Sequence, residues 1–154
     1  MSKFDSSLDR DANFLAISGG LPFLQRKTRE FTGATGLGAQ GAATLFTVTG
    51  DVLVRIFASC TEDLAGATAT IEVGITGNTA ALIAQTTATN IDVGKSWMDT
   101  SPATIEAVDL ASGFVIVDGA DIIETIATAN ITDGTLKYYC FWRPLSTNGM
   151  VVAA

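Results

Sequence analysis

The stretch TLKYYCFWR (residues 135–143) decides the fold, because its side chains alternate in character from one position to the next. In an extended chain, Leu136, Tyr138, Cys140 and Trp142 fall on one side, and Lys137, Tyr139, Phe141 and Arg143 fall on the other. A period of two is typical of a β-strand with one buried face. We therefore expect a strand here, with Tyr138 and Trp142 in the core.

The same period of two runs through DVLVRIFASC (51–60) and ATIEVGIT (69–76). Turn-forming pairs such as Gly77-Asn78 and Asp133-Gly134 separate these runs at short intervals. About eight or nine short strands, with no long segment of helical period, predict an all-β fold, an antiparallel β-sandwich of the jelly-roll type. The expected strands cover 44–48, 51–60, 68–76, 80–88, 91–97, 103–109, 113–118, 121–130 and 134–143.

The segment TAALIAQTTAT (79–89) has two interpretations. Its alanines are compatible with a short helix. Its threonines and its strand-like neighbours favour a strand, because β-branched side chains suit a pleated, half-buried surface.

The first forty residues lack steady alternation and contain Gly19-Gly20, Pro22 and a glycine cluster that ends at Gly41. We expect residues 1–41 to form an extended arm with a flexible glycine linker, and residues 42–154 to form the sandwich domain. The arm is too apolar for a solvated tail, so it is expected to dock on its own domain, a sister subunit or a larger partner. The residues expected to make this contact are Phe14, Leu15, Leu21, Phe23, Leu24, Arg26, Lys27, Arg29 and Phe31.

Gly36, Gly38 and Gly41 have the spacing G-x-G-x-x-G of dinucleotide-binding loops. That motif requires a buried strand before the glycines and a helix after them, whose N-terminus receives the pyrophosphate. Here the preceding REFT (29–32) is short and charged, and the following AATLFTVT (42–49) alternates like a strand. We interpret these glycines as a hinge for the arm and not as a nucleotide site.

The composition argues against several kinds of catalytic and metal site. The chain has no histidine, which removes Ser-His-Asp and Cys-His pairs and the common zinc sites. Acidic pairs remain, but Asp118 and Asp121 are interpreted as solvated residues of a hairpin turn, with a bound calcium ion as the alternative. Cys60 and Cys140 are expected to be buried and reduced, with a disulfide between neighbouring strands as the alternative. We expect no catalytic residues, no metal, no cofactor and no enzymatic activity.

The 154-residue chain is 47% hydrophobic and only 16% charged, with a net charge of −7. Its first 30 residues hold five basic and four acidic side chains, whereas the remainder holds four basic and twelve acidic ones. The negative charge argues against nucleic-acid binding, which needs a basic face. The low charge suits a surface that packs on other proteins, or equally an ordinary β-domain with threonine-rich faces. With no signal peptide and no apolar run of about 18 residues, we expect synthesis in the cytoplasm and no membrane contact.

Between Leu45 and Pro144 the chain resembles small structural proteins encoded near the head genes of tailed bacteriophages, in particular capsid decoration (cement) proteins. The stretches that carry the resemblance are VTGDVLVRIFA (48–58), VGITGNTAALIAQTTATNID (73–92), SPATIEA (101–107) and FVIVDGADIIETIATANITDGTLKYYCFWRPLS (114–146). What they share with these proteins is a composition of strands rich in Thr, Ala and Gly. They do not form a catalytic motif.

The resemblance implies a non-enzymatic virion protein on the capsid exterior that bridges major capsid protein subunits, as a homotrimer in preference to a homodimer. The alternative is a β-module of a phage head spike, tail or fibre that binds a glycan or receptor. Aromatic side chains on a β-face are typical of both protein cores and sugar sites. Trp97, at the end of an expected strand, is the candidate glycan contact in this alternative.

Overall fold

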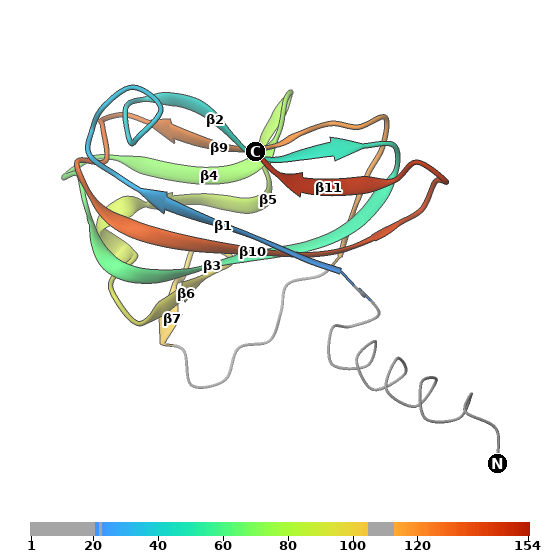
Figure 1. Ribbon diagram of the computed structural model, residues 1–154. Helices are drawn as coiled ribbons and strands as arrows, with labels where there is room; N and C mark the ends of the chain where they lie inside the picture. The colour runs from blue at the N-terminus through green and yellow to red at the C-terminus, as the bar shows by residue number, and fades with distance from the viewer. Residues whose placement is uncertain (1–20, 22, 105–112) are drawn as a thin grey trace, which may run out of the picture.

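The computed structural model describes Leu21, residues 23–104 and residues 113–154, which form a sandwich of two antiparallel β-sheets (Figure 1). The strands are β1 (Phe23–Glu30), β2 (Gly41–Thr49), β3 (Val52–Ala65), β4 (Thr70–Ile75), β5 (Asn78–Thr87), β6 (Lys95–Trp97), β7 (Ala103–Thr104), β8 (Phe114–Ile116), β9 (Ile122–Ala127), β10 (Asp133–Pro144) and β11 (Met150–Ala153), and a turn of 3-10 helix, η1, covers Ala88–Asn90.

The strand order confirms the predicted sandwich and its jelly-roll type. In the first sheet β1, β10 and β3 lie side by side, and the long β3 then pairs with β8 along one part and with β6 along another. The second sheet has the order β11-β2-β9-β4-β5. Two four-stranded sheets, β1-β10-β3-β8 and β2-β9-β4-β5, make up the eight-stranded jelly roll. The strands β6, β7 and β11 are additions to it.

The core lies between the sheets and is built from the alternating positions that the sequence marks. On β10, Leu136, Tyr138, Cys140 and Trp142 are all buried, as expected. Cys60 on β3 is also buried, and both thiols are free. Cys60 lies opposite Leu136 and not opposite Cys140, so the two cysteines occupy neighbouring strands without pairing. Burial raises the pKa of the Cys140 thiol to about 12.

The strand β1 corrects the predicted domain boundary at residue 41. It pairs with β10 along its whole length, from Phe23 opposite Trp142 to Glu30 opposite Thr135. The sandwich therefore includes residues 23–30, which the sequence assigns to the extended arm. The alternation of apolar and polar residues is not visible in β1, because its inward positions include Lys27 and Arg29. The polar groups of these two side chains form hydrogen bonds at the edge of the sandwich.

Two local expectations have different outcomes. Residues 79–89 form most of β5 and the start of η1, so the strand interpretation of this segment is confirmed. The turn at Asp118-Gly119 does not close a hairpin, because β8 belongs to the first sheet and β9 to the second. Nor is Asp121 simply solvated, since one of its carboxylate oxygens accepts a hydrogen bond from Val48 N at 2.9 Å.

Candidate interaction surface

The structure distributes the predicted arm residues and does not gather them on one surface. Phe14 and Leu15 lie outside the described residues, and Leu21 is fully buried. Arg29 and Phe31 are also buried. Phe23 is exposed at the edge, where its ring lies against Trp142 with centroids 4.7 Å apart. Leu24 and Arg26 point outward from the sheet, and Lys27 inward, toward the second sheet.

The outward side of the first sheet carries an aromatic and cationic surface, which we call the outer face. The register of β1, β10 and β3 places Leu24, Phe141 and Arg55 in one row across the sheet. The next row holds Arg26, Tyr139 and Phe57, and the rings of Phe57 and Tyr139 stack with centroids 4.9 Å apart. The outer face comprises Leu24, Arg26, Leu53, Arg55, Phe57, Val115, Lys137, Tyr139, Phe141 and Arg143.

The β2–β3 turn at Gly50-Asp51 lies at the end of the sandwich where β1 begins (Figure 1). Asp51 O accepts hydrogen bonds from Leu145 N and Ser146 N, and an Asp51 carboxylate oxygen accepts one from Asp118 N. Four large exposed apolar side chains belong to the segments at this end of the sandwich, and we call them the apolar end. They are Phe23, Val117, Leu145 and Met150, which are 47%, 56%, 47% and 47% exposed.

A buried polar cluster joins the two sheets beside the β1 edge. Arg29 Nη2 donates to Glu124 Oε1 at 3.1 Å and to Gly36 O at 2.8 Å, while Tyr138 Oη donates to Glu124 Oε2 at 2.8 Å. Desolvation raises the pKa of the fully buried Glu124, and the Arg29 charge and the Tyr138 hydrogen bond oppose that rise. Burial likewise raises the pKa of Tyr138.

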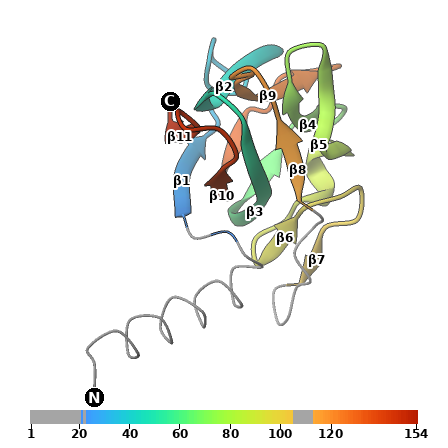
Figure 2. The ribbon, with the colours of Figure 1, turned by 90° about the vertical axis from the view of Figure 1, so that its right-hand side faces the viewer.

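The β1 edge lies next to β11, the edge strand of the second sheet (Figure 2). Lys27 Nζ donates a hydrogen bond to Ala154 O across this edge. Partial burial, and the nearby Arg29 charge, lower the pKa of Lys27. Charged inward side chains of this kind discourage another chain from pairing with an exposed strand edge.

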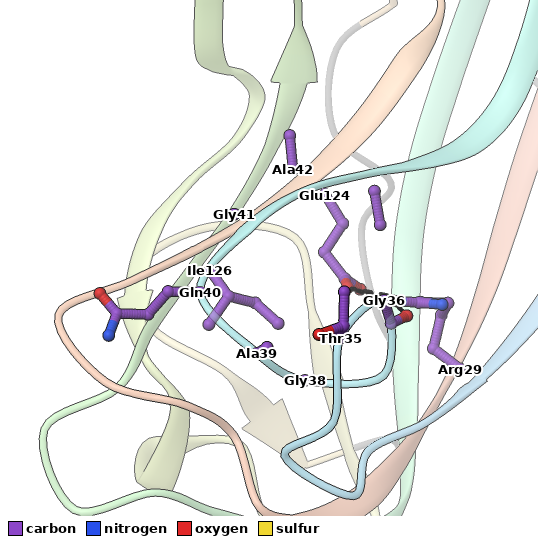
Figure 3. A pocket seen from close by; sticks show the side chains of 11 residues that line it. Arg29, Thr35, Gly36, Gly38, Ala39, Gln40, Gly41, Ala42, Glu124 and Ile126 are labelled. Atoms are coloured by element: carbon purple, nitrogen blue, oxygen red, sulfur yellow. Dashed lines mark hydrogen bonds and ion pairs between the residues drawn. The ribbon is translucent and has the colours of Figure 1, made fainter.

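The glycine cluster forms an ordered loop against this buried cluster, which corrects its interpretation as a flexible hinge (Figure 3). Gly38 O accepts a hydrogen bond from Ile131 N at 2.8 Å, and Thr32 N donates to Leu37 O at 2.7 Å. A cavity of about 100 Å³ lies under the loop, lined by Arg29, Glu124 and small side chains. It is far smaller than the roughly 300–1,000 Å³ of ligand pockets, and a strand, not a helix, follows Gly41. The loop therefore lacks the structural context of a dinucleotide site.

Substitution of Gly38 by alanine is expected to destabilise the protein more than substitution of Gly36. Both glycines have positive φ, 75° at Gly36 and 108° at Gly38, so each alanine costs about 1–2 kcal/mol of backbone strain. A Cβ at Gly38 would also lie 2.1 Å from Ile131 O, whereas one at Gly36 would meet nothing within 4 Å. Urea unfolding of the two variants measures the difference. Equal losses of stability would show that the loop moves freely.

Trp97 is not available to a glycan. Its side chain is fully buried, and its Nε1 donates to Thr86 Oγ1 at 2.8 Å. Its ring packs edge-on against Tyr138 with centroids 6.4 Å apart. A sugar ring needs an exposed aromatic face, so the assignment of Trp97 as a glycan contact is wrong.

Within residues 21, 23–104 and 113–154, no group of three or more His, Cys, Asp or Glu side chains is placed to hold a metal ion. None of the helical segments in this part of the chain has the length and apolar character needed to cross a membrane.

No protein-family model matches the chain, and no curated protein matches its sequence. Two solved structures are similar in shape. The acid-stable capsid structure of Helicobacter pylori bacteriophage KHP30 contains a chain with 11% identity and a TM-score of 0.48, over 87% of this chain and 96% of that one. The capsid asymmetric unit of cyanophage Pam1 contains a chain with 18% identity and a TM-score of 0.42, over 79% of this chain and 84% of that one.

Proposed function

We propose that this chain is a non-enzymatic virion structural protein that binds the outside of a phage capsid and bridges major capsid protein subunits. The sequence resemblance between Leu45 and Pro144 motivates the proposal. The observation that supports it most is the apolar end, where four large apolar side chains are exposed at the end of the sandwich at which the chain enters β1. Clustered exposed apolar side chains mark surfaces that bind other proteins.

The predicted arm enters the sandwich at the apolar end. Phe23 is the first residue of β1, so residues 1–20 join the sandwich at this end. An arm and an apolar surface that start from the same place can contact two neighbouring capsid subunits at once. A specific interface needs about 1,600 Å² of buried surface in total, and many symmetric copies, here proposed as homotrimers, add avidity.

Deletion of residues 1–20 is expected to reduce occupancy at least tenfold on capsids purified from the phage that encodes the chain. The deletion leaves β1 in place, so the thermal unfolding midpoint is expected to change little. The double variant Val117→Ser/Leu145→Ser is expected to weaken binding similarly, because it removes apolar contact area from the apolar end. Co-sedimentation of capsids with bound protein measures both effects.

Val93→Ser provides the matched control. Val93 is also an exposed aliphatic residue, at 58%, but its backbone N bonds to Asp63 near the opposite end of β3. We expect this variant to bind like the unmodified chain. Undiminished occupancy after deletion of residues 1–20 would remove the arm from the proposal, and equal binding by all three variants would remove the apolar end as well.

A further inference from the structure

The outer face of the first sheet concentrates positive charge in an acidic protein. It carries Arg26, Arg55, Lys137 and Arg143 at outward positions of three adjacent strands, while the chain as a whole has a net charge of −7. Within the described residues none of these four side chains forms an ion pair. Their charges are therefore not neutralised by a neighbour within the part of the sandwich that the structure describes.

The acidic side chains of the same three strands are segregated from these cations. Glu30, Glu62, Asp63 and Asp133 all lie toward the far end of the sheet, where Glu30, Thr135 and Glu62 form one of the last rows. The rows that begin at Arg143 and at Arg26 contain only cationic, aromatic and aliphatic outward residues. The three rows from Arg143 to Arg26 thus hold the arginines and no acidic side chain, whereas Lys137 lies one row from Glu30 and Glu62.

The apolar residues of the outer face are of the types that dominate protein interfaces. Tyr, Phe and Arg are enriched at interface centres, where Lys, Glu and Asp are depleted. In the strand register Arg26 lies beside Tyr139, Arg55 lies beside Phe141, and Phe57 lies on the far side of Tyr139 from Arg26. Partly exposed rings in this position supply contact area without a large loss of side-chain entropy.

We propose that the outer face is a docking surface for a flat, acidic protein surface, and we infer that this partner is the capsid exterior. The inference rests on the proposed function and adds to it the chemistry of the partner. Charge complementarity assigns the occupant, because an acidic partner would be attracted by the arginines of the outer face and repelled by the net negative charge of the chain as a whole. A second copy of this acidic chain or a nucleic acid is a competing occupant that the experiment distinguishes.

The test neutralises two exposed cations of the outer face in the full-length chain. Arg26→Gln/Arg143→Gln is compared with Gln85→Glu/Thr87→Glu, which alters exposed positions of β5 in the other sheet, away from the apolar end. Both double variants change the net charge by the same amount, to −9 from −7. Urea unfolding checks that both remain folded. Binding to purified capsids is measured by co-sedimentation at 50 mM and 500 mM NaCl.

We expect Arg26→Gln/Arg143→Gln to bind capsids at least tenfold more weakly at 50 mM NaCl, and Gln85→Glu/Thr87→Glu to bind like the unmodified chain. The difference should shrink at 500 mM, since salt screens exposed charges. Equal binding by both variants would overturn the docking surface while leaving the proposed function standing. If the unmodified chain does not bind capsids, both proposals fail.

Two further measurements separate the competing occupants. In the first, a 20-nucleotide single-stranded DNA is titrated into the same three proteins. If Arg26→Gln/Arg143→Gln loses DNA binding and keeps capsid binding, the outer face binds nucleic acid and the proposal is overturned. Mass measurement in solution compares their oligomeric states. A change of oligomeric state caused by the same variant, with capsid binding retained, would assign the face to contact between copies and would also overturn it.

Discussion

Replacement of Arg29 by methionine is expected to lower the free energy of unfolding by about 3–5 kcal/mol near neutral pH. The substitution leaves Glu124 fully buried without the guanidinium that contacts it at 3.1 Å. Tyr138 would still donate one hydrogen bond, but a single neutral donor does not compensate a buried carboxylate. Urea unfolding at pH 7.5 measures the loss.

The effect of Arg29→Met should depend on pH in a defined direction. Burial already raises the pKa of Glu124 above its ordinary value of 4.5, and removal of Arg29 raises it further. The folded state then binds a proton more tightly than the unfolded state does, so stability rises as the pH falls through the raised folded pKa toward 4.5. The deficit of the variant relative to the unmodified chain is therefore expected to shrink between pH 7.5 and pH 5.

Two further variants identify the cause of this loss. Arg29→Met/Glu124→Leu removes both charges and should recover most of the stability, because a buried ion pair can be replaced by apolar side chains at little cost. Tyr138→Phe removes only one hydrogen bond to the carboxylate and should cost about 1.5–3 kcal/mol. If Arg29→Met alone were as stable as the unmodified chain, the pair would not hold β1 to the second sheet.

The strands that were predictable from the sequence are those whose inward positions are uniformly apolar. From Val52 to Cys60 on β3 and from Leu136 to Trp142 on β10 every second residue is buried, and the sequence shows this alternation. On β1 the inward positions include Lys27 and Arg29, which find their partners at Ala154 and Glu124, 127 and 95 residues further along the chain. A local sequence pattern cannot show that a buried charge has a hydrogen-bond partner so far along the chain. The sequence therefore predicts an arm where the structure has the first strand of the jelly roll.

The outer face was partly visible in the sequence and partly not. The residues opposite the core on β10, such as Tyr139 and Arg143, were identified as the other face of that strand. Their alignment with Arg26 on β1 and Phe57 on β3 depends on which strands are neighbours and in what register. A shift of one residue would turn each side chain to the opposite side of the sheet. The charge segregation therefore became apparent only from the pairing of the three strands.

Truncation of Trp97 to alanine is expected to cost about 3–5 kcal/mol, the usual range for removal of a buried aromatic side chain. Trp97 lies opposite Ala58 in the short pairing of β6 with β3, and its ring fills space against Tyr138. Its loss would leave a cavity and would also deprive Thr86 Oγ1 of the indole donor. Thermal and urea unfolding measure the change.

Trp97→Phe separates packing from the hydrogen bond and tests the discarded glycan role at the same time. Phenylalanine retains most of the ring volume, so the expected cost is about 1–2 kcal/mol, close to that of one hydrogen bond. Because Trp97 is fully buried, neither variant should change binding to a glycan array except through unfolding. The contrary result would be a glycan signal that the unmodified chain gives and a stably folded Trp97→Phe variant does not. That result would show that the indole ring becomes exposed and contacts the glycan. It would restore the receptor-binding alternative.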